Sequence, residues 1–305
     1  MLETRIADPA PFVAAPDCHS PEEILAHHKF PLARERFIGA VLALYEGDAF
    51  LTRLTVEAAR QVVFGVIVRL DAGCDPDDPA TCPTLGLLKQ QMAQFGLSSP
   101  RRIESLVALL VHNGFLESIP SLRDRRQRLL RPTAKMLAAD LDWLVVNYLP
   151  LQVMFPDPGY GGVMHRDPVF HRTLCRVAMS FFGQGAQILG GNPDIMVFLE
   201  RDAGTLILFK LAEMAGAANG GTVAFDYKEV GARFGVSRTH VQKIVQDAAR
   251  AGLITATGRG NRFVTLTPRA WRALDRFIAE SMSGNDLLFR IAQRQPEGSA
   301  RRATA

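Results

Sequence analysis

The sequence predicts a mainly α-helical chain that contains two similar units, each with a small β-hairpin. Apolar residues recur at helical spacing through most of the 305 residues. An internal repeat relates the segment near residues 103–115 to the segment near residues 241–253. Short apolar runs separated by glycine and arginine follow both repeated segments, and this pattern favours hairpins.

Composition indicates a globular chain of about two domains, since one domain usually takes roughly 100–200 residues. Hydrophobic residues make up 48% and charged residues 22%, which excludes a largely disordered chain. Neither a membrane-spanning apolar run nor a secretory signal is visible, so we expect a cytoplasmic protein without membrane association. Four scattered cysteines do not make a disulfide framework, and we expect Cys74 and Cys82 as free thiols, with a regulatory disulfide as the alternative.

Proline and glycine clusters divide the chain into five expected segments. An irregular arm covers residues 1–31, with a short helix near Pro21 to His28. The first domain covers residues 32–148, a linker with an inter-domain helix covers 149–195, and the second domain covers 196–283. Residues 284–305 are expected to form a flexible tail.

The internal repeat keeps a constant spacing of 138 residues along its main helix. The six positions of the first copy are Ile103, Leu106, Val107, Leu110, Gly114 and Phe115. Their counterparts in the second copy are Val241, Ile244, Val245, Ala248, Gly252 and Leu253. Just upstream, Phe95-Gly96-Leu97 matches Phe234-Gly235-Val236 with a slip of one residue. We therefore expect the same architecture twice.

The second copy shows the repeated architecture more clearly. Asp226 is suited to cap a short helix that ends at Gly235, and Ser237 is suited to cap the next helix, Arg238 to Ala251. Strands are expected at Leu253 to Ala256 and at 262–267, around a turn at Thr257 to Asn261. A helix, a turn, a helix and a hairpin with a basic tip together resemble a winged helix-turn-helix.

The first copy repeats this order, with helices at Leu85 to Phe95 and Pro100 to Asn113. Strands are expected at Phe115 to Ile119 and Arg128 to Arg131, around a wing that contains Asp124 and Arg126. Residues 52–148 resemble MarR-type transcription regulators, and the resemblance implies an Asp-x-Arg wing that places arginine against the DNA minor groove. The second copy has no matching acidic residue and resembles winged helices only generically.

Positive charge is concentrated in the two copies. Residues 101–131 hold seven arginines and three acidic residues, and residues 228–262 hold seven basic and two acidic residues. This pattern favours binding to double-stranded DNA through phosphates and base edges. The expected DNA-binding residues are Ser99, Arg101, Arg102, Ser105, Arg123, Arg125, Arg126 and Arg128 in the first copy, and Ser237, Arg238, Thr239, His240, Gln242, Lys243, Gln246, Arg259, Asn261 and Arg262 in the second.

A sequence-specific transcription regulator is the first hypothesis. The alternatives are a plasmid-type replication initiator, which also carries two winged helices, and a scaffold that binds only proteins. A homodimer and a small lipophilic effector are further candidate partners. The helix from Asp167 to Phe182 is expected to be an inter-domain core helix, or alternatively to line the effector pocket with polar contacts from His165, Arg166, His171 and Arg172.

No catalytic residue, cofactor or metal site is expected. Cys18-His19 and His27-His28 lack the CxxC or HxxxH spacing of zinc sites. Asp75, Asp77 and Asp78 lack the glycine and terminal glutamate of a calcium loop.

Overall fold

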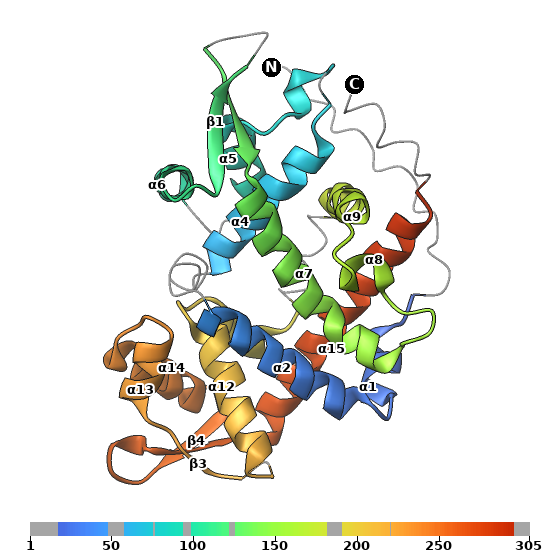
Figure 1. The fold of residues 1–305 in the computed structure, drawn as a ribbon. Coiled ribbons are helices and arrows are strands. Elements are labelled where there is room, and N and C mark those ends of the chain that lie inside the picture. The colour runs from blue at the N-terminus through green and yellow to red at the C-terminus, as the bar shows by residue number, and fades with distance from the viewer. Residues whose placement is uncertain are drawn as a thin grey trace, which may run out of the picture.

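The computed structural model describes residues 18–47, 58–75, 77–93, 99–121, 126–181, 191–219 and 221–295. Within these segments the chain is mainly helical, with two small antiparallel sheets, which confirms the expected fold class at this level (Figure 1). Among the helices of the described segments, none combines the length and the apolar character needed to cross a membrane.

The first repeat runs from α4 to β2. Its elements are α4 (Ala58–Gly73), the 3-10 helix η1 (Pro79–Thr81), α5 (Leu85–Ala93), α6 (Pro100–His112), β1 (Leu116–Pro120) and β2 (Arg128–Pro132). The two strands pair antiparallel, with Leu116 opposite Pro132. Thr84, directly before α5, forms an isolated bridge with Leu129 of β2 and so attaches the start of α5 to the hairpin.

The second repeat runs from α12 to β5, and its α-helices and hairpin strands follow the same order as those of the first repeat. Its elements are α12 (Gly204–Ala217), β3 (Val223–Ala224), α13 (Tyr227–Arg233), α14 (Arg238–Arg250), β4 (Ile254–Thr257), the 3-10 helix η2 (Arg259–Asn261) and β5 (Phe263–Leu266). The strands lie in the order β3-β5-β4. The bridge at Thr84 in the first repeat takes the place that β3 has in the second.

Within the described segments, seven further helices form a body between and beside the repeats. They are α1 (Pro21–Ala26), α2 (Phe30–Gly47), α7 (Ala134–Met154), α8 (Gly161–Met164), α9 (Pro168–Ser180), α11 (Pro193–Leu199) and α15 (Pro268–Gln293). The hairpin of each repeat leads directly into a long helix, α7 after β2 and α15 after β5. In Figure 1 these two helices run through the centre of the molecule.

Two hydrophobic cores hold the chain together, and α7 and α9 contribute to both. The smaller core contains α4, α5, α6 and the first hairpin, together with Met136 of α7 and Cys175 of α9. The larger core contains the second repeat, α1, α2 and α15, together with Leu151 of α7 and Leu174 of α9. Leu174 and Val177 on the apolar face of α9 are buried in the larger core.

Three expected boundaries are corrected by this packing. The expected domain end at residue 148 lies inside α7, which continues past Pro150 because Leu151 and Met154 are buried. The helix α2 was assigned to the first domain, but it packs against α7 and α12 in the larger core. The expected tail from residue 284 begins within α15, whose residues Asp286 and Phe289 are buried.

The N-terminal arm is held against α15 in its described part. Ser20 and Glu23 form a capping box that starts α1, and Ile24 is fully buried. The carboxylate of Asp286 accepts hydrogen bonds from the backbone N–H of His19 at 2.8 Å and from the hydroxyl of Tyr160 at 2.8 Å. Because Asp286 is completely buried, these donors and Arg290 provide the partners that a buried carboxylate requires.

Cys74 and Cys82 form a disulfide, so the expectation of two free thiols is corrected. The intervening loop folds back on itself, with a bridge between Asp75 and Asp78 and a hydrogen bond from the N–H of Thr81 to the carbonyl of Asp78. This turn brings the two Cα atoms within 4.3 Å. The aspartates of the loop serve its turns, since Asp75 and Asp78 accept hydrogen bonds from the N–H groups of Asp77 and Ala80.

Candidate nucleic-acid interface

The second helix of each repeat begins in the same way. Both α6 and α14 have 13 residues and keep the spacing of 138 residues. Ser99 and Ser237 are their N-caps, and each hydroxyl accepts a hydrogen bond from a backbone N–H of the first turn, that of Arg102 at 3.4 Å and that of His240 at 3.1 Å. Their side chains therefore serve the helix start, although Ser99 and Ser237 were expected to contact DNA.

Both helices also end in the same way. Gly114 and Gly252 have φ values of +71° and +73°, a left-handed conformation that glycine adopts without steric cost. The N–H groups of Phe115 and Leu253 then bond to carbonyls five residues back, at 3.0 and 2.9 Å. The chain is thereby turned from the helix into the hairpin.

A threonine joins the far end of each hairpin to the same glycine turn. The hydroxyl of Thr133 lies 2.8 Å from the carbonyl oxygen of Gly114, and that of Thr267 lies 3.0 Å from the carbonyl oxygen of Gly252. The two threonines also cap α7 and α15. Their spacing is 134 residues because the first hairpin is four residues longer than the second.

In both repeats a basic side chain adds a further hydrogen bond between the start of the long helix and the end of the repeated helix. Lys135 donates to the carbonyl of Asn113 at 3.2 Å, and Arg269 donates to the carbonyl of Ala251 at 3.3 Å. Both carbonyls belong to the residue that ends the repeated helix, where the helix dipole favours positive charge. The repeats therefore agree in side-chain contacts as well as in the order of their elements.

The exposed face of α14 is polar and basic along its length. Arg238, Thr239, Lys243 and Gln246 are exposed, whereas Gln242 is half-buried. The ring of His240 lies 2.9 Å from the carbonyl oxygen of Asp202, so His240 is held against the turn before α12. Asp247 pairs with Arg201 at 2.9 Å and also with Arg250, and these pairs offset its negative charge.

The exposed face of α6 carries arginine only in its first turn, and His112 is exposed in its last turn. Arg101 and Arg102 are exposed, but the hydroxyl of Ser105 donates to the carbonyl of Arg101 at 3.0 Å. Further along, Leu109 and Val111 remain 37% and 38% exposed. Glu104 forms an ion pair with Lys89 of α5. The two repeats therefore present different chemistry on the same frame.

The second wing is a tight turn that carries the expected basic residues. Gly258, Gly260 and Asn261 all have positive φ, and Arg259 and Arg262 are exposed. The Tyr227 hydroxyl donates to the carbonyl of Asn261 at 2.5 Å and so attaches the wing to α13. The guanidinium of Arg262 lies 4.9 Å from the centre of the Phe263 ring, a cation–π contact.

The first wing is described only in part. Arg123, Asp124 and Arg125 lie outside the described residues. Arg126 and Arg128 are exposed, and the Nε of Arg128 donates to the hydroxyl of Ser118 across the hairpin at 2.9 Å. Arg128 therefore stabilises the pairing of β1 and β2.

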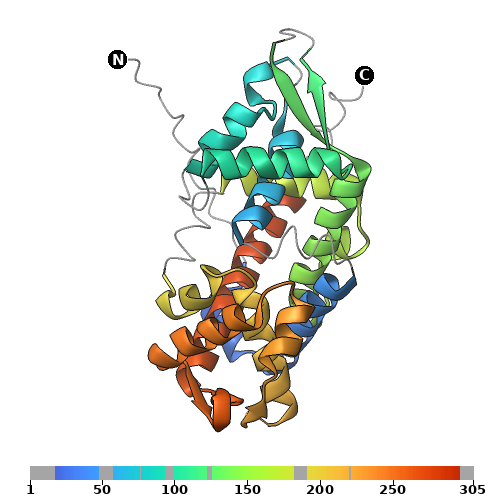
Figure 2. The same ribbon diagram turned by 90° about the vertical axis from the view of Figure 1, so that its left-hand side faces the viewer.

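The candidate helices lie on one side of the molecule. In Figure 1, α6 and the α13–α14 pair both lie at the left-hand edge, with α6 above the pair. Figure 2 views this side directly, and α6 crosses the upper part of the molecule while the second repeat occupies the lower part. Elements of both repeats therefore lie on the same side of the molecule.

The carboxylate of Asp226, which lies directly before α13 in the chain, has a shifted pKa. Asp226 caps α13 by accepting hydrogen bonds from the backbone N–H groups of Glu229 and Lys228, and these bonds lower its pKa. The carboxylate therefore stays ionised at neutral pH. It supports the start of α13, the helix that precedes the turn to α14.

Comparison of the chain with protein-family models, with curated proteins and with solved structures finds no match.

A buried polar cluster on α7 and α9 was not expected from the sequence. Asp140, His171 and Cys175 are all buried, and their candidate ligand atoms lie within 4.8 Å of one another. The available sequence signal was the spacing of His171 and Cys175, which places both on one face of a helix. The histidines near the N-terminus behave differently, since His19 and His27 lie against the ring of Phe155.

Three of the four polar side chains expected near an effector are held by other contacts, and the fourth, His165, is exposed. Arg166 pairs with Asp142, Arg172 reaches the carbonyl of Asp71 at 3.4 Å, and His171 belongs to the buried cluster. A small lipophilic effector stays a hypothesis.

Proposed function

We propose that this protein is a sequence-specific double-stranded DNA-binding regulator of transcription with two winged helix-turn-helix units. The observation that carries the proposal is the duplicated frame of two helices and a hairpin, with the second helix exposed in both copies. Helices presented in this way fit the major groove of DNA, and hairpin wings reach the adjacent backbone or minor groove.

The side chains on this frame have the chemistry that DNA recognition needs. Arg238, Lys243 and Gln246 on α14 can bond to base edges, because arginine and lysine suit guanine and glutamine suits adenine. Arg259 and Arg262 on the wing can neutralise phosphates. The first repeat contributes Arg101 and Arg102 at the start of α6.

Selection of bound sequences from a random duplex pool, with the full chain as bait, tests the proposal. We expect enrichment of a defined motif and an affinity that falls steeply with added salt. Arg238→Ala combined with Lys243→Ala should abolish enrichment, whereas Arg276→Ala, an exposed arginine on α15 that forms an ion pair with Glu280, should not. Absence of a motif together with salt-independent retention on DNA would exclude the proposal.

A second candidate function follows from the exposed apolar residues of α6. Leu109 and Val111 are unusual on a helix that enters a DNA groove, and they favour a protein contact, either with another copy of this chain or with a scaffold partner. Light scattering of the full chain and of Leu109→Asp tests this alternative. A dimer that the substitution dissociates would support it.

A further inference from the structure

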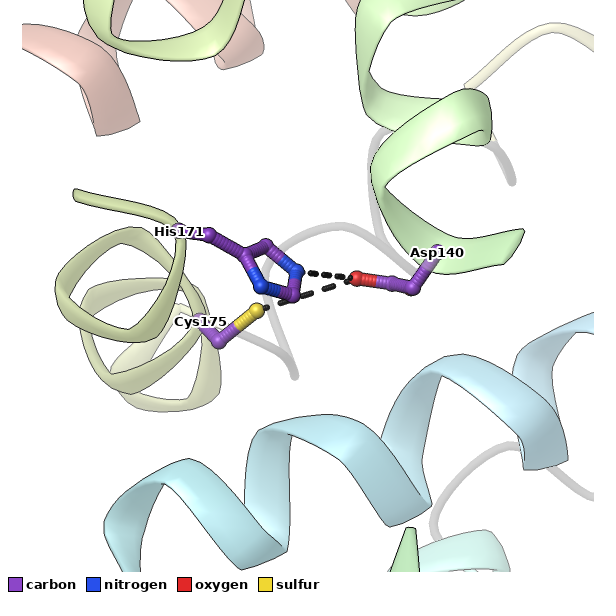
Figure 3. Close-up of side chains that lie close together, drawn as sticks. All are labelled: Asp140, His171 and Cys175. Atoms are coloured by element: carbon purple, nitrogen blue, oxygen red, sulfur yellow. Dashed lines mark hydrogen bonds and ion pairs between the residues drawn. The ribbon is translucent and has the colours of Figure 1, made fainter. Parts of the chain in front are cut away.

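Three side chains from two helices meet in the interior beside the first repeat. The Nε2 of His171 lies 2.7 Å from a carboxylate oxygen of Asp140, and the Sγ of Cys175 lies 3.9 Å from the same oxygen. Their exposed fractions are 6% for His171, 3% for Asp140 and 2% for Cys175. Figure 3 shows that His171 and Cys175 extend from α9 toward Asp140 on α7.

The helices fix this arrangement. His171 and Cys175 are four residues apart on α9, so their side chains lie on the same face, one turn apart. Asp167 caps α9 and Thr133 caps α7, which sets the ends of both helices. The helix α9 also packs against α4 of the first repeat. The cluster therefore lies where the first repeat meets the central helices.

A catalytic role does not fit the cluster. A cysteine nucleophile must be a thiolate that a substrate can reach. Burial, with a smaller effect from the charge of Asp140, raises the pKa of the Cys175 thiol far above its usual range. The thiol is therefore buried and keeps its proton unless a metal ion takes the place of that proton.

The donor set instead matches that of a transition-metal ion. Thiolate, imidazole and carboxylate are the three ligand types that Zn²⁺ prefers. In a tetrahedral zinc site, neighbouring ligand atoms are separated by about 3.3 to 3.8 Å, as follows from the usual bond lengths. The separations of 2.7 and 3.9 Å from the Asp140 oxygen lie on either side of this range, and all three ligand atoms lie within 4.8 Å of one another, so side-chain adjustments of about 1 Å would bring them to this range.

We infer that Asp140, His171 and Cys175 form a binding site for a zinc-class divalent transition metal. Three protein ligands leave a fourth tetrahedral position for water. Binding replaces the thiol proton by the metal, and this proton is released to solvent. The bound ion fastens α9 to α7 beside the first repeat.

Titration of the full chain with Co²⁺, after treatment with a chelator, tests this site without DNA. Cobalt reports a thiolate ligand by a charge-transfer band in the near ultraviolet and a tetrahedral site by intense visible bands. We expect saturation at one equivalent, bleaching by Zn²⁺, and a higher melting temperature of the metal-bound chain. The titration is done without reductant, so that Cys74 and Cys82 stay in their disulfide.

Single substitutions show whether the thiolate band of the Co²⁺-bound chain comes from the buried cluster. Cys175→Ser should abolish the thiolate band, and His171→Ala should weaken Co²⁺ binding by at least about tenfold. Cys18→Ser removes the other free cysteine and should change neither. A folded wild-type chain without a thiolate band would overturn the inference, and so would a band that survives Cys175→Ser. Because no DNA is present, neither outcome depends on the proposed regulatory function.

Discussion

At matched positions, α6 and α14 carry different side chains on the same backbone frame. Ser105 corresponds to Lys243, Ala108 to Gln246 and Leu109 to Asp247. The second helix has a long polar side chain at the first two positions, where the first helix has a short one. Hydrogen bonds to base edges require a long polar side chain, so, if the chain binds DNA as proposed, we expect α14 to make most of the base contacts.

Lys243→Ala is therefore expected to weaken binding to the selected DNA more than Ser105→Ala does. A lost base contact costs about 1 to 3 kcal/mol, and the preference at one base position should relax. Fluorescence anisotropy with matched and single-mismatch duplexes measures both effects. If Lys243→Ala behaved like the control Arg276→Ala, α14 would not be the helix that reads bases.

The wing residues are expected to position the protein without specifying sequence. Arg259→Ala should weaken binding to all duplexes and reduce the slope of log affinity against log salt by about one unit for the lost phosphate contact. We expect the same of Arg125→Ala in the first wing. Affinity is measured at several salt concentrations on two unrelated sequences. A changed base preference with an unchanged salt slope would contradict this assignment.

The cap of α13 makes a pH-dependent contribution to stability. The pKa of Asp226 is lowered in the folded chain by its backbone hydrogen bonds, so the stabilisation is present above the unfolded value near 4 and is lost as the pH falls through the folded value. Asp226→Ala should therefore reduce stability toward urea at pH 7 but have little effect in strong acid. Thr84→Ala, the uncharged cap of α5, should have an effect that does not change with pH.

At the scale of elements, local signals predicted the two repeated helices well. The structure places α6 at Pro100–His112 and α14 at Arg238–Arg250, one residue shorter at the C-terminal end than expected. Serine caps and glycine ends act through backbone groups a few residues away, so they are visible in the sequence. The expected bounds of the hairpin strands also agree with the observed bounds to within about two residues, because they too depend on residues close by in the chain.

Elements that depend on distant packing were missed or cut short. Pro150 and Gly284 indicated breaks, but both lie inside helices, and their cost is outweighed by burial of Leu151 and Phe289 on the same helices. The helices α11 and α12 were not recognised, since α12 is apolar on most sides and has little helical periodicity. The buried cluster joins positions 140, 171 and 175, and only the tertiary fold brings these together.

The hydrogen bond from each threonine to its glycine turn predicts that equivalent substitutions have equal effects in the two repeats. Thr133→Val and Thr267→Val each remove a helix cap and a bond to the glycine turn, so each should cost about 1 kcal/mol of stability. Urea unfolding of the full chain measures the cost. Thr255→Val, an exposed position on β4, is the control and should have a smaller effect. If Thr133→Val left the stability unchanged while Thr267→Val lowered it, the hydrogen bond from threonine to the glycine turn would matter in only one repeat.

At the scale of the whole molecule, the two repeats are not separable units. Residues of α7 and α9 pack in both cores, so a cut near residue 148 would remove Leu151 and Met154 from the larger core. The contributions of the repeats are therefore best compared in the full chain. The position of both repeats on one side of the molecule suits a single DNA duplex that contacts both (Figure 2).

If one duplex contacts both repeats, neither should be sufficient for full affinity. We expect Arg101→Ala with Arg102→Ala, or Arg238→Ala with Lys243→Ala, to lower affinity for the selected site by on the order of 10²- to 10⁴-fold, because the second contact is an intramolecular event. The footprint on the duplex should shorten from one end in the first variant and from the other end in the second. Gel shift and footprinting measure these changes.

DNA spacing provides the complementary test of the same prediction. Inserting about five base pairs between the two half-sites turns one of them by half a helical turn to the opposite side of the duplex. A chain with its repeats fixed on one side should then lose affinity to nearly the same extent as the double variants. An intact footprint after substitution of Arg101 and Arg102, together with indifference to the insertion, would mean that the first repeat does not contact DNA. The exposed Leu109 and Val111 would then point to a protein as its partner.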